Sequence, residues 1–409
     1  MTSPSPFVGA NHRSVKQGNR ATIFRAIRAL GPIARVNLAR QSRLNPGTVT
    51  NIVDELLDAG LVTETGQGPS RVGRRPVYLE VVPSARYAIG IDIARNAITG
   101  ALIDLAGRPV ERLEGFSGSW LSGDRVVAVV TDLIARLLAT PAADGGAKVV
   151  GIGVGSPGPL SISSGRILAP PYYGSGEELP LQQEIESRFN LPALVDNNSN
   201  TSTLAELWFG AGQGVEDFVL LTLGTGVGSG LVLDGELYRG GHDLAGELGH
   251  MSINADGPRC ACGNFGCLEM YVSVPRVLAA VRGALAIGEP SALRAVAPRE
   301  EDLTLAMVFA AVRDGDPLAS RVFADVVRRL AAGLVNIVNA FDPELILLGR
   351  DLASAGDLLL DPVREEVRRR VFPIRRDAVR IEVAALTDAP TIGAATLALR
   401  EFFHAPLTR

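Results

Sequence analysis

Residues 246–269 read Gly-Glu-Leu-Gly-His-Met-Ser-Ile-Asn-Ala-Asp-Gly-Pro-Arg-Cys-Ala-Cys-Gly-Asn-Phe-Gly-Cys-Leu-Glu and contain all 3 cysteines of the 409-residue chain. Together with His250, the side chains of Cys260, Cys262 and Cys267 offer three thiolates and one imidazole, the ligand set of a closed tetrahedral zinc site. Free cysteines also occur simply as small core residues, which is the alternative interpretation. Because every cysteine of so long a chain falls within one short segment, we predict a structural Cys3His zinc site.

The spacing of this segment resembles that of a known family. His250, nine further residues and then Cys-x-Cys-Gly-x-x-Gly-Cys-x-Glu are similar to the zinc signature of the ROK family, whose members are bacterial sugar-responsive repressors and sugar kinases. The resemblance covers about residues 19–405. It implies a two-lobed α/β domain of the actin-like, ribonuclease-H type, in which a sugar binds between the lobes.

Composition limits the class of protein. The chain has 46% hydrophobic residues and 45 glycines, which at this length is typical of a globular protein with more than one domain. No uncharged apolar run of about 18 residues occurs, and the first residues lack the pattern of a secretory signal, so we predict no membrane association. Clustered zinc-type cysteines fit a reducing cytoplasm, where we expect the protein.

The net charge of −4 is unevenly distributed along the chain. Residues 1–80 contain eleven Lys/Arg and five Asp/Glu, a net charge of +6, which leaves −10 for the remainder. A basic N-terminal part on an acidic body suggests a polyanionic partner such as DNA, although charge alone more often marks a solvated surface.

The N-terminal part has three runs of helical periodicity between residues 19 and 61, followed by a strand-like segment at 77–82. The third run opens at Asn45-Pro46, an N-cap followed by proline at the first helical position. Three helices and a two-stranded ribbon predict a winged helix-turn-helix, with a small helical interaction domain as the alternative. This part also resembles the DNA-binding domain of ROK repressors, which the family's kinases generally lack. The predicted DNA-binding residues, at the start of the third helix and in the later Arg-rich loop, are Gly47, Thr48, Thr50, Asn51, Arg74 and Arg75.

After residue 83 the chain twice shows apolar strands in a hairpin followed by helices and further buried strands. We therefore expect a flexible segment at 1–18, the winged helix at 19–83, a first α/β lobe at 84–205 that is completed by residues 391–405, and a second lobe with the zinc site at 206–390.

The resemblance also implies a sugar site. Carboxylates accept hydrogen bonds from vicinal hydroxyls, and amides both donate and accept them. One nitrogen of His250 would bind zinc and the other would face the sugar. Taken singly, these residues could instead be caps, turn residues or solvated acids. The positions that the family pattern assigns to the sugar site are Gly155, Pro157, Gly158, Asn197, Asn198, Glu247, His250 and Glu269.

The kinase features of the family are largely missing. Family kinases use an Asn-Asp pair whose aspartate accepts the hydroxyl proton, and that position is Asn198 here, with Asp196 as a poor substitute. The first phosphate loop reads Asp92-Ile-Ala-Arg-Asn, without its glycines, and the adenosine turn reads Gly349-Arg-Asp. We therefore predict no enzymatic activity. One glycine loop is kept, which we interpret as a vestigial phosphate loop, and its residues are Gly224, Thr225, Gly226 and Gly228.

The sequence thus predicts a transcriptional regulator, most simply a repressor, that binds a double-stranded DNA operator as a homodimer or homotetramer. Its DNA affinity would be controlled by a sugar that binds the two states unequally. One alternative is an ATP-dependent sugar kinase with an appended DNA-binding module. Another is a constitutive DNA-binding protein whose sugar site is vestigial.

Overall fold

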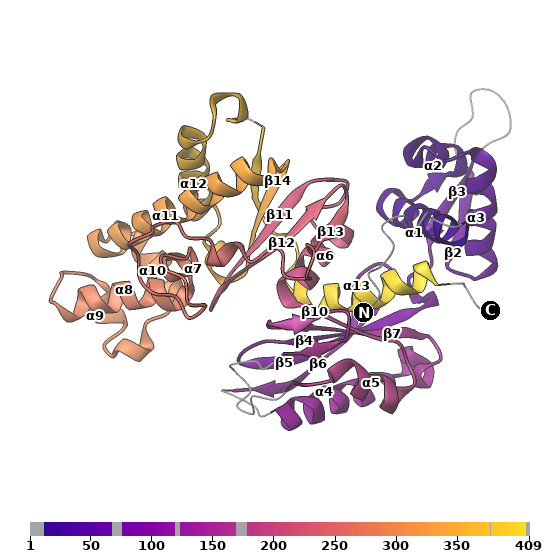
Figure 1. Ribbon diagram of the computed structural model, residues 1–409, viewed down its shortest axis with the longest axis horizontal. Helices are drawn as coiled ribbons and strands as arrows, with labels where there is room; N and C mark the ends of the chain where they lie inside the picture. The colour runs from indigo at the N-terminus through magenta and orange to yellow at the C-terminus, as the bar shows by residue number, and fades with distance from the viewer. Residues whose placement is uncertain (1–11, 68–75, 119–122, 169–177, 377, 406–409) are drawn as a thin grey trace. The chain divides into compact units, whose positions relative to one another are not determined.

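The computed structural model describes residues 12–67, 76–118, 123–168, 178–376 and 378–405. They form two compact units, of which the first runs to Phe209 and resumes at Asp388, and the second spans Gly210–Thr387 (Figure 1). The chain therefore crosses between the units twice, within a few residues of the predicted lobe boundaries. None of the described helices combines the length and the apolar character that a membrane span requires.

The N-terminal part of the first unit contains three helices and a small antiparallel sheet in the order β1-β3-β2. The third strand is a correction to the predicted two-stranded ribbon: the two residues of β1 are buried and pair with Leu79 and Tyr78 of β3. Helix α1 begins at His12, so residues 12–18, expected to be flexible, are helical, since neither proline nor glycine interrupts them before Gly18. The elements are α1 (His12–Leu30), β1 (Ile33–Ala34), α2 (Arg35–Ser42), α3 (Pro46–Asp58), β2 (Val62–Gln67) and β3 (Val77–Val81).

The apolar periodicity explains how these helices pack. Helix α3 starts as predicted, because the Gly47 N–H donates to Oδ1 of Asn45 at 2.8 Å and Pro46 occupies the first turn. The apolar faces of the three helices meet in one core. Its fully buried side chains include Ile23, Phe24, Ile27, Leu38, Val49, Ile52, Val53 and Leu56.

The rest of the first unit is a five-stranded sheet in the order β10-β7-β4-β5-β6, with helices on both faces (Figure 1). Strands β4, β5 and β6 form antiparallel hairpins, whereas β7 and β10 run parallel to β4. Helices α4 and α5 share one apolar core with the sheet. The elements are β4 (Tyr87–Ile93), β5 (Ala97–Asp104), β6 (Pro109–Ser117), α4 (Gly123–Leu138), β7 (Val149–Ser156), β8 (Leu160–Ser161), β9 (Arg166–Ile167), α5 (Leu181–Phe189), β10 (Ala193–Asn197), α6 (Asn198–Phe209) and α13 (Ala389–His404).

Glycines allow α13 to pack unusually close to β7 and α6. A Cβ atom on Gly153 of β7 would lie 1.7 Å from the carbonyl oxygen of Ala394, and one on Gly393 would lie 1.6 Å from that of Thr201. No larger residue fits at either place without displacing backbone. This packing fixes α6, and with it the junction of β10 and α6 at which Asn197 and Asn198 lie.

Helix α1 docks on α13 and on the end of α6, both within the first unit. The ring of Phe24 stacks on Phe403 with centroids 3.9 Å apart, and Arg20 donates to the carbonyl oxygen of Phe403 at 2.8 Å. The guanidinium of Arg28 lies 4.3 Å from the ring centroid of Phe209. Burial lowers the pKa of Arg28 to about 9. Two of the arginines counted in the N-terminal charge of +6 therefore face protein, so that charge overstates the basic surface.

The second unit repeats the arrangement of the first. Its sheet has the order β13-β12-β11-β14-β15, again with two antiparallel pairs followed by two parallel ones. This confirms the predicted pair of similar α/β halves. The elements are β11 (Phe218–Leu223), β12 (Val227–Leu233), β13 (Glu236–Tyr238), α7 (Glu269–Val272), α8 (Val274–Ala286), α9 (Leu293–Val296), α10 (Leu305–Arg313), α11 (Pro317–Phe341), β14 (Leu345–Gly349), α12 (Asp357–Arg370) and β15 (Arg380–Val383).

The core of the second unit lies between its sheet and the long helix α11, with α7, α8 and α12 contributing. A Cβ atom on Gly333 of α11 would lie 2.7 Å from Leu268, so α11 packs tightly on the segment that follows Cys267.

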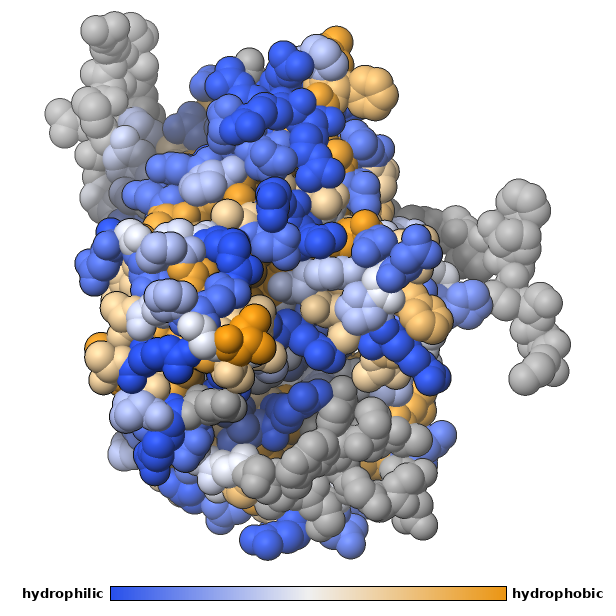
Figure 2. Space-filling view, turned by 90° about the vertical axis from the view of Figure 1, so that its left-hand side faces the viewer, coloured by the Kyte–Doolittle hydropathy of each residue, from blue (hydrophilic) through white to orange (hydrophobic). Residues whose placement is uncertain are grey.

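On the face of the molecule drawn in Figure 2, hydrophilic side chains predominate and hydrophobic ones occur in small groups. That face has the character of a solvated surface.

Candidate functional site

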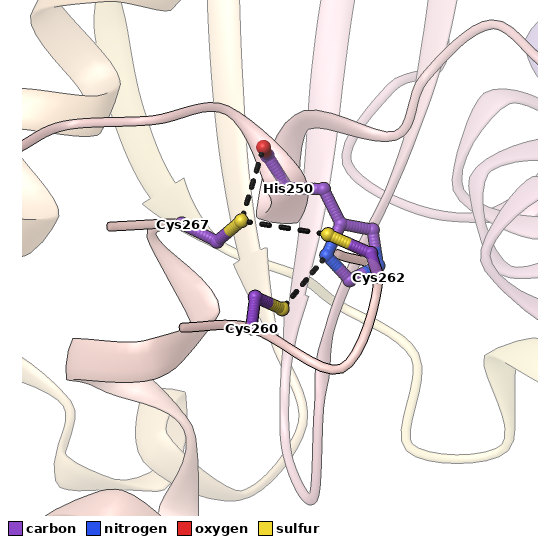
Figure 3. Close-up of side chains that lie close together, drawn as sticks. All are labelled: His250, Cys260, Cys262 and Cys267. Carbon is purple, nitrogen blue, oxygen red and sulfur yellow. Dashed lines mark hydrogen bonds between the residues drawn. The ribbon is translucent and has the colours of Figure 1, made fainter. Parts of the chain in front are cut away.

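The four predicted metal ligands come together in the second unit (Figure 3). The donor atoms of His250, Cys260, Cys262 and Cys267 all lie within 4.8 Å of one another. The Cys260 Sγ is 3.6 Å from the His250 Nδ1, and the Cys262 Sγ is 3.7 Å from the Cys267 Sγ. A tetrahedral centre with metal–sulfur bonds of about 2.3 Å has sulfur–sulfur edges of about 3.8 Å. The four donors therefore lie close enough together to hold one metal ion.

A compact loop brings the sulfur atoms together. The Cys260 N–H donates to the carbonyl oxygen of Asn264 at 2.8 Å, which closes the turn between the first two cysteines and the third. Gly266 has a φ of +63°, and a Cβ atom there would lie 1.7 Å from the carbonyl oxygen of Asn254, so only glycine fits. The side chain of Asn264 also donates to the carbonyl oxygen of His250 at 3.2 Å. These hydrogen bonds hold the loop close to His250 in addition to any contact made by the cysteine side chains.

The cysteines differ in their electrostatic surroundings. Burial raises the pKa of the Cys267 thiol to about 12. The pKa of the Cys262 thiol is lowered, chiefly by a hydrogen bond from the backbone of Asn264. Because metals bind thiolates, loading this site releases protons, and a metal must displace the one on Cys267.

The second-unit residues predicted for the sugar site lie beside this cluster. Residues Leu248–His250 form a short 3-10 turn, labelled η3, which turns Nδ1 of the histidine toward Cys260. Its Nε2 is 3.9 Å from Oε2 of Glu247, whose side chain is exposed. Oε2 of Glu269 accepts a hydrogen bond from the Val227 N–H at 2.9 Å. The two ring nitrogens of His250 thus face different partners, Cys260 and Glu247.

The first-unit residues predicted for the sugar site lie at the carboxyl ends of β7 and β10. These strands are parallel neighbours, so their ends and the following loops meet at one edge of the sheet. A Cβ atom on Gly158 would lie 3.5 Å from the Asn197 Nδ2, and one on Gly155 would lie 3.5 Å from the Asn198 Cα. Oδ1 of Asn197 accepts from the Ser199 N–H at 2.8 Å and so caps α6. The structure therefore brings together the predicted first-unit set of Gly155, Pro157, Gly158, Asn197 and Asn198.

The possible replacement for a catalytic aspartate is buried. Asp196 is 1% exposed, and its Oδ1 accepts hydrogen bonds from the Asn197 N–H at 2.7 Å and from the Asn200 Nδ2 at 2.8 Å. A carboxylate held in this way serves to order the start of α6. The residue predicted to stand in place of the kinases' aspartate, Asn198, has a carboxamide side chain, which cannot accept a proton at neutral pH.

The retained glycine loop faces carboxylates. A Cβ atom on Gly224 would lie 3.2 Å from Oδ2 of Asp351, and one on Gly226 would lie 2.7 Å from Oε2 of Glu269. Thr225 is exposed between them, and Gly228 belongs to β12. Two carboxylates, of Asp351 and Glu269, therefore lie next to the loop.

The residues predicted to bind DNA on α3 share its exposed side. Gly47, Thr50 and Asn51 are exposed and Thr48 is half-buried, whereas Val49 and the later apolar positions face the core. Arg74 and Arg75 lie outside the described residues. Arg40 and Arg43, which are not among the predicted DNA-binding residues, are also exposed, on and just after α2. Their place in the sequence could have indicated them, since both arginines precede Asn45, the N-cap of α3, by a few residues.

Comparisons with known proteins agree with this architecture. Residues 88–401 match the ROK family. The xylose repressor of Caldicellulosiruptor bescii is 31% identical over 401 residues, which cover 97% of this chain and 99% of that protein. The DNA-binding transcriptional repressor Mlc of Escherichia coli is 28% identical over 397 residues, 96% of this chain and 95% of Mlc.

Two solved structures differ informatively in how much of the chain they cover. A ROK family transcriptional regulator, described as a homologue of Escherichia coli Mlc, has a TM-score of 0.80 and 31% identity, covering 96% of this chain and 98% of its own. A ROK family glucokinase from Streptomyces griseus, in complex with glucose and AMPPNP, has a TM-score of 0.67 and 30% identity, covering 77% of this chain and 99% of its own. The family match, the fold and the cysteine cluster lead to one conclusion: the chain belongs to the ROK family.

Proposed function

We propose that this protein is a transcriptional repressor whose affinity for a DNA operator is lowered by a sugar or sugar derivative. The observation that carries the proposal is the N-terminal part, three helices and a three-stranded sheet placed ahead of the family match that begins at residue 88. A glucokinase of the family matches 77% of this chain, whereas a regulator of the family matches 96%. The names of the relatives, xylose repressor and Mlc, support the same function.

In this proposal the N-terminal part is a winged helix-turn-helix that reads DNA with α3. Its exposed Gly47, Thr50 and Asn51 would approach base edges in the major groove, and Arg40 and Arg43 would approach phosphates. Arg74 and Arg75 would add contacts from the wing. A two-fold symmetric operator is the natural partner of a homodimer or of a pair of dimers.

The effector would be recognised by the polar residues predicted for the sugar site. Carboxylate and amide groups that are already held by the backbone can select one arrangement of hydroxyls, because a misplaced hydroxyl leaves a buried polar group unpaired. Zinc is the metal that best suits three cysteines and a histidine in a closed site. Bound zinc would fix the ring of His250, so that its Nε2 faces the sugar together with Glu247.

Helix α1 offers a route from the effector to the DNA-binding part. It contacts α13, which begins just after the chain returns at Asp388, and through Arg28 it contacts Trp208 and Phe209, which end α6 at the outward crossing. A sugar-dependent change at either crossing would therefore reach α1 directly. The sugar can act only if it binds the DNA-free form more tightly than the DNA-bound form.

The second candidate function, a sugar kinase, is favoured by the retained glycine loop alone. Three features argue against it. By the family pattern, Asn198 replaces the catalytic aspartate of the kinases, and Asp196 is buried. The carboxylates of Asp351 and Glu269 also flank the loop. Incubation of the zinc-loaded protein with Mg-ATP and a sugar panel should release no sugar-dependent ADP. ADP release that the Glu247→Ala variant abolishes would establish the kinase instead.

The repressor itself is tested with Cys262→Ser, measured by bound zinc and by the effect of sugar on DNA binding. We expect the variant to lose zinc and sugar response together, while its sugar-free DNA affinity stays within about threefold of the wild type. A zinc-free variant that still releases DNA on addition of sugar would contradict the role proposed for His250.

A further inference from the structure

Ser229 lies outside the residues assigned to any function so far. It is in β12, at the end of the retained glycine segment, and its side chain is 6% exposed. Its Oγ donates to the carbonyl oxygen of Gly246 and accepts from the Leu248 N–H at 3.1 Å. These two backbone groups flank Glu247. The hydroxyl therefore fixes the chain on both sides of a residue proposed to bind the sugar.

The neighbouring residues of β12 hold the other two second-unit sugar residues. A Cβ atom on Gly249 would lie only 1.9 Å from the carbonyl oxygen of Val227, so the turn that carries His250 rests directly on this strand. The N–H of the same valine donates to Oε2 of Glu269 at 2.9 Å. Two residues of β12, Val227 and Ser229, thus contact the segments that present Glu247, His250 and Glu269.

We propose that the glycine-rich segment at residues 224–230, which resembles a kinase phosphate loop, is retained here as the support of the sugar-recognition residues, with Ser229 as a positioning residue for Glu247. The inference rests on the proposed sugar-responsive function. A hydroxyl donates and accepts at the same time, which is what one side chain needs to bridge a carbonyl and an N–H. A carboxylate held in place before the sugar arrives binds more tightly, because less freedom is lost on binding.

The test compares three variants of the full, zinc-loaded chain. Ser229→Ala removes both hydrogen bonds, and Ser229→Thr keeps the hydroxyl. Ser291→Ala is the matched control, because the Ser291 Oγ also accepts a backbone N–H, that of Leu293, at 3.1 Å in the same unit. The probe is whichever of D-xylose, D-glucose and N-acetyl-D-glucosamine raises the melting temperature of the wild type most, and its Kd is measured by calorimetry.

Loss of the two hydrogen bonds should raise the sugar Kd of Ser229→Ala about tenfold. Ser229→Thr should recover most of the affinity, and the control should stay within about twofold. A purely structural role is excluded by two further readouts, which should be unchanged in Ser229→Ala: the visible absorption of the Co2+-substituted cysteine site and the DNA affinity without sugar.

The outcomes separate this inference from the function on which it rests. Wild-type sugar affinity in Ser229→Ala overturns the positioning role, and so does a joint loss of sugar binding, Co2+ absorption and DNA affinity, which would make Ser229 a general structural residue. If the wild type itself binds none of the sugars, the proposed function fails first and the inference fails with it.

Discussion

Gly249→Ala should displace His250, the proposed zinc ligand, from its support on β12. The new Cβ atom would start 1.9 Å from the carbonyl oxygen of Val227, and separations below 3.0 Å essentially do not occur. The turn must therefore move by at least about 1.1 Å. Metal–ligand distances tolerate only about ±0.2 Å, so His250 cannot keep its place as a ligand. We expect zinc affinity to fall about 100-fold, at the upper end of the effect of losing a residue that orients a ligand.

Gly241→Ala is the matched control for this change. It lies eight residues earlier in the same unit, and its added Cβ atom would meet no atom within 4 Å. Neither glycine has a positive φ, so backbone strain does not distinguish them. Zinc affinity is measured by titration of the zinc-free proteins against a chromophoric chelator. A folded Gly249→Ala variant that binds zinc within about threefold of the wild type would refute the claim that β12 holds the histidine.

Three further changes test other parts of the structure. Asn51→Ala should weaken DNA binding by about tenfold or more, measured by fluorescence anisotropy, and leave the sugar Kd unchanged; unchanged DNA affinity would remove α3 as the reading helix. Phe24→Ala deletes a buried ring that stacks on Phe403 and should lower the free energy of unfolding by about 3–5 kcal/mol in urea denaturation, whereas a loss below about 1 kcal/mol would show that α1 docks elsewhere. Burial raises the pKa of Asp316, but N–H donors such as that of Ala319 lower it more, so its pKa is below the usual value. The ionised Asp316 therefore stabilises the fold fully above the unfolded pKa of about 4, and this stabilisation is lost as the pH falls through the lower pKa of the folded state. The Asp316→Asn variant should lack this acid-dependent loss. Parallel curves of unfolding free energy against pH for the two proteins would contradict the prediction.

Much of the site was predictable because its signals are local in the sequence. The cysteines are few and close together, so their joint location follows from the residues alone, and the structure brings them within bonding reach of one metal together with His250. The two sheets were predictable for a similar reason, since buried strands appear as continuous apolar runs such as β7 and β14.

The remainder depends on tertiary contacts that leave no local pattern. Arg20 and Arg28 are basic residues of the kind that a DNA-binding surface contains. They pack instead on α13 and α6, which lie far away in the sequence. The two-residue strand β1 is too short for any periodicity to reveal. The role proposed for Ser229 depends on hydrogen bonds that form only because the chain returns to it at Gly246 and Leu248.

The central claim is that a bound sugar lowers the protein's affinity for its DNA operator, and one titration tests it most directly. A fluorescent duplex is first selected from a random-sequence pool by the zinc-loaded protein, and its Kd is then measured with and without the sugar that raises the melting temperature most. We predict that the sugar raises the Kd for DNA at least about tenfold and that Mg-ATP does not change it. An unchanged Kd at a sugar concentration that saturates the protein would contradict the account.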